Sequence, residues 1–106
     1  MLLFLLALAG ADTAARPITK TERAIVEAAV LPELETPGTL GIGNIPADTD
    51  FLCGRVNGTV FMVNIARDEK GQITRASNAV VVTRWAPQTI QEFVPIMCTR
   101  GGYDIY

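Results

Sequence analysis

The sequence predicts a small α+β domain in which one N-terminal helix packs on an antiparallel sheet of four or five strands. Three observations support this prediction: a helix-start motif at Thr19 and Glu22, two hydrophobic runs on either side of Asn57-Gly58, and a single pair of cysteines. With 106 residues and no internal repeat, the chain has room for one domain. A helix layer on one face of a sheet is the simplest way to bury these elements.

The first eleven residues have the features of an export signal. An apolar run extends from Leu2 to Ala9, and Ala-Gly-Ala at 9–11 supplies a small-x-small cleavage sequence, although no lysine or arginine precedes the run. The run is too short to cross a bilayer as a helix, which takes about 20 apolar residues. We therefore expect a periplasmic or extracellular protein with no stable membrane span; a buried N-terminal element of a cytosolic protein and an uncleaved membrane tether are the alternatives. The expected organisation is a signal peptide at 1–11, a disordered or extended segment at 12–18 and a single α+β domain at 19–106.

The composition excludes several classes of function. The chain contains no histidine, which rules out Ser-His-Asp and Cys-His nucleophiles, histidine-ligated zinc and an imidazole pH switch. A formal net charge of -2 gives no basic field to attract nucleic acid, so we expect no nucleic-acid partner. No motif indicates a cofactor or a metal site, and we expect neither.

The first element of the domain is a helix. Thr19 and Glu22 have the spacing of a capping box, in which the threonine hydroxyl accepts from the backbone of residue 22 and the glutamate reaches back. Pro32 disfavours the helical conformation at the residue before it, so the helix should span about three turns. The residues expected on its apolar face are Ala24, Ile25, Ala28 and Leu31.

The strongest strand signal is a hairpin. FLCGRV and TVFMVNI flank Asn57-Gly58, the dipeptide that suits a type I′ turn. A two-residue loop places Gly54 opposite Phe61, where the aromatic ring can lie over a residue that has no side chain. Cys53 then points to the other face of the hairpin. The apolar face that the helix is expected to cover contains Leu52, Val56, Phe61, Val63 and Ile65.

Signals in the rest of the chain are weaker. Residues 39–45 are a possible strand interrupted by glycines, residues 67–72 form a polar loop, and residues 79–85 form a third firm strand. The segment 90–99 is either a short helix leading into a strand or a strand alone, with Pro95 favouring an edge position. Gly101-Gly102 should turn the chain before its short C-terminal tail.

Cys53 and Cys98 are the only cysteines of the chain, and neither lies in a C-x-x-C pair. In an exported protein a structural disulfide is therefore the natural assignment. Closing a loop of about 45 residues would stabilise the fold by roughly 4 kcal/mol. Two buried, reduced thiols are the alternative, while the wide spacing disfavours a catalytic dithiol.

The order of a helix, a P-G-T-L link and the sequence CGRVN at 53–57 resembles small exported bacterial proteins that share a C-G-x-V-N motif. The resemblance covers about Ala24 to Ile65. This chain differs after Gly58, where such proteins tend to carry a hairpin rich in glycine and aromatic residues. The resemblance implies an exported α+β protein whose motif cysteine pairs with one near the C-terminus, and it implies no activity, because those proteins are largely uncharacterised.

Two functions of different classes remain. The first is a non-catalytic interaction module that contacts an envelope or secreted protein through an exposed sheet face and the tail at 101–106. The alternative is a small hydrolase or anion-binding protein that uses arginines and carboxylates, because arginine forks bind carboxylates and phosphates in two-point geometry. A flat apolar patch would favour the first, and a concave pocket with converging arginine and acidic side chains would favour the second. The candidate binding residues, on or next to predicted strands, are Arg55, Arg75, Arg84 and Arg100.

Overall fold

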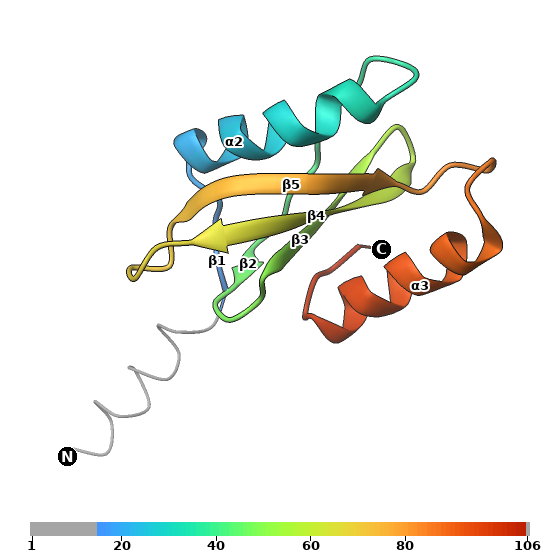
Figure 1. The fold of residues 1–106 in the computed structure, drawn as a ribbon. Helices are drawn as coiled ribbons and strands as arrows, with labels where there is room; N and C mark the ends of the chain where they lie inside the picture. The colour runs from blue at the N-terminus through green and yellow to red at the C-terminus, as the bar shows by residue number, and fades with distance from the viewer. Residues whose placement is uncertain (1–14, 106) are drawn as a thin grey trace.

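The computed structural model describes residues 15–105, in which two helices pack on opposite faces of a three-stranded antiparallel sheet (Figure 1). The strand order is β3-β4-β5, and a separate two-stranded sheet pairs β1 with β2. In chain order the elements are β1 (Ala15–Arg16), α2 (Lys20–Val30), the 3-10 turn η1 (Leu31–Glu33), β2 (Ile45–Pro46), β3 (Phe51–Val56), β4 (Thr59–Arg67), β5 (Ile73–Val81) and α3 (Gln88–Arg100).

The α+β class is confirmed, but the single sheet of four or five strands is wrong. The segment expected as a strand at 39–45 meets β3 only through one bridge, in which the Gly41 N–H donates to the Arg55 carbonyl at 2.7 Å and the Arg55 N–H returns a bond at 2.8 Å. The segment at 90–99, expected to supply another strand, is helical. The predicted signal peptide at 1–11 lies outside the described residues, and within the segment 12–18 two residues form β1.

The predicted hairpin is confirmed in turn and in register. Asn57 and Gly58 have φ values of 51° and 77°, as a type I′ turn requires. Gly54 lies opposite Phe61, and a Cβ at Gly54 would lie 2.6 Å from the Phe61 ring and 2.6 Å from the Gly41 carbonyl oxygen. Glycine is therefore needed there so that a ring and a neighbouring backbone can both approach β3 closely.

The predicted start of α2 is confirmed, whereas its predicted apolar face is wrong. The Glu22 N–H donates to the Thr19 hydroxyl at 3.2 Å, and the Thr19 N–H donates to the Glu22 carboxylate at 3.0 Å. The helix buries the row Glu22, Val26 and Val30 and leaves the predicted face largely outside, with Leu31 41% exposed. The helix is rotated because a carboxylate occupies a core position that pattern analysis reserves for apolar residues.

The predicted disulfide between Cys53 and Cys98 is confirmed, with a Cα–Cα distance of 5.8 Å. It joins β3 to α3, so α3 covers the sheet face opposite α2 (Figure 1). The expectation of a strand at 90–99 is wrong because Val94 and Cys98, four residues apart, are both fully buried on one side of a helix. Pro95 lies inside this helix, where it donates no backbone hydrogen bond, and it is only partly buried.

The third strand begins and ends earlier than predicted, at Ile73–Val81 rather than 79–85. After the buried Ile73, residues 74–78 of β5 are mostly polar and exposed because β5 is an outer strand of the sheet, so this part lacks the apolar alternation by which strands are recognised. None of the helices formed by the described residues is long and apolar enough to span a membrane.

The described part of the C-terminal tail, residues 101–105, is partly buried, whereas an exposed contact surface was expected. Tyr103 and Ile105 are buried, and the Tyr103 hydroxyl donates to the Phe51 carbonyl at 2.6 Å. Burial also raises the pKa of Tyr103. The sheet face expected to be open is likewise covered, since Cys53 and Val60 on it are 2% and 8% exposed.

Candidate functional site

The structure does not bring the four candidate arginines onto one site. Arg55 pairs with Val60 of β4, and Arg75 pairs with Ala66 of the same strand. These two partners are six positions apart along β4, so the two arginines are attached to the sheet about 20 Å from each other. The Arg55 guanidinium donates to the carbonyls of Ile105 at 2.6 Å and Gly58 at 3.1 Å, so it fastens the tail.

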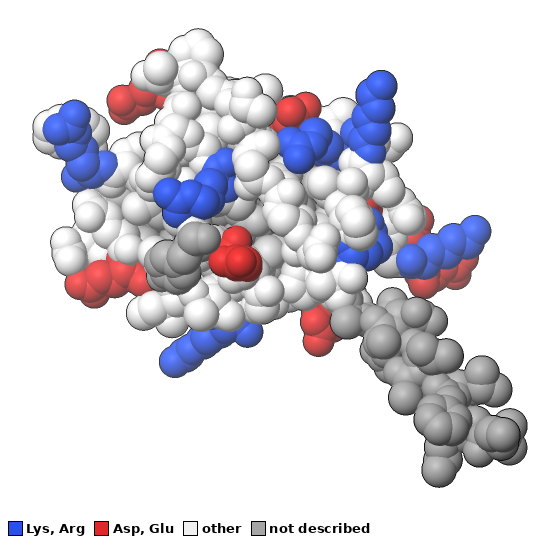
Figure 2. All heavy atoms as spheres, turned by 180° about the vertical axis from the view of Figure 1, so that it is seen from behind, with Lys and Arg blue, Asp and Glu red and all other residues white. Residues whose placement is uncertain are grey.

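The other two candidate arginines lie outside the sheet. Arg100 is in the last turn of α3, where it borders a shallow groove with Pro95, Ile96 and Thr99. Arg84 follows β5, and it alone of the four lines the pocket described next. Figure 2 shows acidic and basic side chains interspersed on the face that it displays, so neither sign dominates that face.

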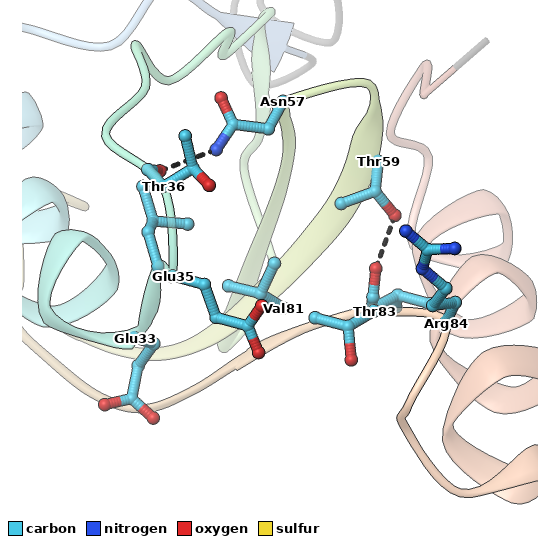
Figure 3. Close-up of a pocket in the computed structure, with 10 residues that line it drawn as sticks. Glu33, Glu35, Thr36, Asn57, Thr59, Val81, Thr83 and Arg84 are labelled. Carbon is cyan, nitrogen blue, oxygen red and sulfur yellow. Dashed lines mark hydrogen bonds between the residues drawn. The ribbon is translucent and has the colours of Figure 1, made fainter.

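A pocket of about 490 Å³ lies between the segment after η1, the β3–β4 turn and the end of β5 (Figure 3). Its walls are held by two hydrogen bonds, from the Asn57 amide to the Thr36 carbonyl at 2.8 Å and from the Thr59 hydroxyl to the Val82 carbonyl at 2.6 Å. The residues that line it are Glu33, Leu34, Glu35, Thr36, Asn57, Thr59, Val81, Val82, Thr83 and Arg84.

The pocket carries charges of both signs. Figure 3 shows the Glu35 carboxylate and the Arg84 guanidinium on opposite sides of it, while Glu33 points away from its centre. The Arg84 guanidinium lies 5.4 Å from the centroid of the Trp85 ring, a cation–π contact that leaves its N–H edges available. The pocket thus has a hydrogen-bond acceptor, Glu35, and a hydrogen-bond donor, Arg84, and apolar side chains also line it. The volume of the pocket suits a small ligand or a peptide segment.

Three large apolar side chains within residues 85–100 are exposed. Trp85 is 77% exposed, and Phe93 and Ile96 are each 50% exposed. Phe93 and Ile96 stand three residues apart on α3, away from the buried row that faces the sheet. The Gln91 amide donates to the Ala86 carbonyl at 2.9 Å and holds the Trp85 loop to the helix. We call residues 85–100 the α3 segment.

Glu22, which the sequence assigns to the capping box, is a charged group that the structure also places in the core. Its side chain is 1% exposed. The Arg16 guanidinium donates to both carboxylate oxygens, at 2.7 and 2.6 Å, and the Ile73 N–H donates at 2.7 Å. Arg16 also donates to the Gly71 carbonyl at 2.9 Å, which links β1 to the β4–β5 loop.

The hydrogen bonds to Glu22 determine its ionisation. The Arg16 guanidinium lowers the pKa of the Glu22 carboxyl from 4.5 to about 2, against the opposing effect of burial. A carboxylate whose oxygens are all engaged by the fold is a structural group, because it has no lone pair to offer a substrate. The Glu22, Val26, Val30 spacing of four was the one sequence signal of this burial.

Residues 15–105 hold no group of three or more Cys, Asp or Glu side chains placed to bind a metal ion. Comparison with protein-family models, with curated protein sequences and with solved structures found no match to the chain.

Proposed function

We propose that the protein is a small exported, non-catalytic binding protein that contacts an envelope or secreted protein through the α3 segment. The observation that carries this proposal is the exposure of Trp85, Phe93 and Ile96, which are 77%, 50% and 50% exposed. Large aromatic and aliphatic side chains of this kind supply most of the energy of protein interfaces. The Cys53–Cys98 bond immobilises the helix that presents two of them, which lowers the entropy lost on binding.

Two further observations support a binding role over catalysis. Among residues 15–105 the acid with a strongly lowered pKa is Glu22, which is buried and fully hydrogen-bonded, so it is not poised for proton transfer. The four candidate arginines lie at separate places rather than around one substrate. Export is supported by the apolar run with its small-x-small sequence and by the disulfide, which persists in oxidising compartments.

The binding role is tested with the double variant Phe93→Ser/Ile96→Ser. Immobilised wild-type protein is expected to retain a specific protein from a solubilised envelope fraction, and the variant is expected to retain at least about tenfold less of it, because interface anchors are lost. The matched control is Thr89→Ala/Glu92→Gln, two exposed changes on the same helix, which should retain the wild-type amount. Equal retention by the Phe93/Ile96 variant would refute a role for the α3 segment.

Export is tested directly by measuring the intact mass of the protein in separated cell fractions. The expected species is depleted from the cytosol, lacks residues 1–11 and is two hydrogens lighter than the reduced chain because of the Cys53–Cys98 bond. Finding instead a full-length, reduced protein in the cytosol would refute the assignment of the compartment.

A further inference from the structure

The outer side of α3 carries a regular row of exposed residues. Figure 1 shows α3 as the outer layer on its face of the sheet, and the buried Val94 and Cys98 lie on its inner side. Exposed positions recur along the helix at spacings of three and four, which places them on one side of it. We call this row the outer α3 face; its residues are Thr89, Glu92, Phe93, Ile96, Thr99 and Arg100.

The outer α3 face has one charge on each side of its apolar centre. Glu92 and Arg100 are the only charged residues of α3, and Ile96 lies midway between them, four positions from each. Neither of them forms a salt bridge within residues 15–105, and the Glu92 carboxylate accepts only a hydrogen bond from the Gln88 amide, at 2.8 Å. Both charges are therefore available to a partner.

This arrangement of charges is complementary to itself in one orientation. When two copies of the face meet antiparallel about a two-fold axis at Ile96, residues equally far before and after Ile96 lie opposite each other. Glu92 of each copy then meets Arg100 of the other. An in-register parallel pairing would instead place like charges together at both positions, which is unfavourable.

The shape of the face suits the same antiparallel pairing. A groove of about 280 Å³ beside Ile96 is lined by Pro95, Ile96, Thr99 and Arg100. In the antiparallel pairing Phe93 of one copy lies opposite Thr99 of the other, so its ring meets this groove. The two-fold axis repeats the contact, and both Phe93 rings, each 50% exposed in the single chain, are covered.

We propose that the outer α3 face pairs with the same face of a second copy of this chain, antiparallel and with two-fold symmetry. Phe93 and Ile96 form the centre of the contact, and two Glu92–Arg100 ion pairs fix its orientation. The pairing goes beyond the binding role proposed above and does not depend on it. Because it covers the same apolar side chains, a second copy and an envelope protein compete for α3.

The contact is small, which sets the affinity to expect. Two helices that meet over about two turns bury less than the roughly 1,200 Å² of stable complexes. We therefore expect a reversible dimer with a Kd on the order of 100 µM.

The test is sedimentation equilibrium of the purified, oxidised protein from about 10 µM to about 1 mM, a range that brackets the expected Kd. Glu92→Arg and Arg100→Glu each replace both ion pairs by pairs of like charges and should weaken the dimer at least about tenfold. The double variant Glu92→Arg/Arg100→Glu brings opposite charges together again and should pair as wild type does. Phe93→Ser/Ile96→Ser should abolish the dimer.

Matched controls reverse the same charges away from α3, at Glu69 and Arg75, both of which are exposed. Glu69→Arg and Arg75→Glu change the net charge by the same amounts and should leave the Kd within about twofold of wild type, because distant surface charges are screened by salt. Rescue by the double variant would not reflect a more stable helix, since both of its reversed charges oppose the dipole of α3. Thermal unfolding confirms that each variant is folded.

Three results would overturn the proposal: wild type that stays monomeric at about 1 mM, single reversals that leave the Kd unchanged, or a double variant that pairs as weakly as the single ones. None of them bears on the envelope partner, because its retention is measured with separate, immobilised copies. A wild type that dimerises but retains no envelope protein would support the pairing and refute the binding role; a monomeric wild type that retains it would do the reverse.

Discussion

Replacing Cys53 and Cys98 together by alanine is expected to lower the free energy of unfolding by about 4 kcal/mol. The bond closes a loop with a sequence separation of 45, and this value follows from the entropy that such a loop removes from the unfolded chain. Because domains of this size have net stabilities of about 5–15 kcal/mol, the loss is a large fraction of the whole. Thermal unfolding should show it as a fall in Tm of about 15–30 °C.

The control for this prediction is the reduced wild-type protein. If the bond acts as a cross-link, reduction should lower the Tm almost as much as the double alanine variant does, because the two cysteines fill nearly the same buried space in either state. A fall in Tm of less than about 5 °C on reduction would contradict the prediction, and would show that Val94 and the buried tail hold α3 on the sheet unaided.

Features determined by neighbouring residues were predicted correctly from the sequence. The Asn57-Gly58 turn sets the register of the hairpin, because its backbone conformation has only one way to continue into both strands. The capping box at Thr19 and Glu22 is equally local. The disulfide was predicted by elimination, since the chain contains one pair of cysteines.

Apart from the disulfide, features that depend on distant parts of the chain were predicted wrongly or not at all. Pro95 favoured an edge strand within 90–99, but the energy of a helix on a sheet comes from its buried row and here also from the bond at Cys98. The rotation of α2 depends on Arg16, which neutralises a carboxylate in the core. Amphipathic patterns treat every carboxylate as exposed and cannot anticipate such a pair.

The candidate site was predicted only in part. Arg84 was singled out for its side-chain chemistry, and the structure places it at a pocket; Arg55, Arg75 and Arg100 lie elsewhere. Glu35 lies 49 positions before Arg84 in the chain and has no motif around it, so no spacing relates the two. Their relation arises because the chain after η1 returns to the end of β5.

Glu22→Gln is expected to lower the free energy of unfolding by about 3 kcal/mol near neutral pH. Glutamine keeps the size of the side chain but removes the charge that receives two hydrogen bonds from Arg16, at 2.7 and 2.6 Å. Breaking a buried ion pair by removing one partner costs about 3–5 kcal/mol, and the partial exposure of Arg16 places this pair at the low end. The measurement is urea unfolding at pH 7, and the control Glu69→Gln, an exposed acid, should change stability by less than about 0.5 kcal/mol.

The same carboxylate makes stability depend on pH in a defined window. Because the pKa of Glu22 falls from 4.5 in the unfolded chain to about 2 in the fold, its ionisation stabilises the folded state fully above pH 4.5, and this contribution is lost as the pH falls towards 2. A lowering of this size corresponds to about 3 kcal/mol, in agreement with the cost expected for Glu22→Gln. The difference in stability between wild type and Glu22→Gln should therefore shrink as the pH falls from about 5 to 2.

A double-mutant cycle with Arg16→Gln shows whether this energy belongs to the ion pair. In the Arg16→Gln background, Glu22→Gln should cost less than in wild type by at least about 1 kcal/mol, because the carboxylate is then buried without its cation. Equal costs in both backgrounds would mean that the backbone N–H groups of Thr19 and Ile73 hold the charge unaided. A negligible cost in both would contradict the burial of Glu22, and with it the rotation of α2 that places this residue in the core.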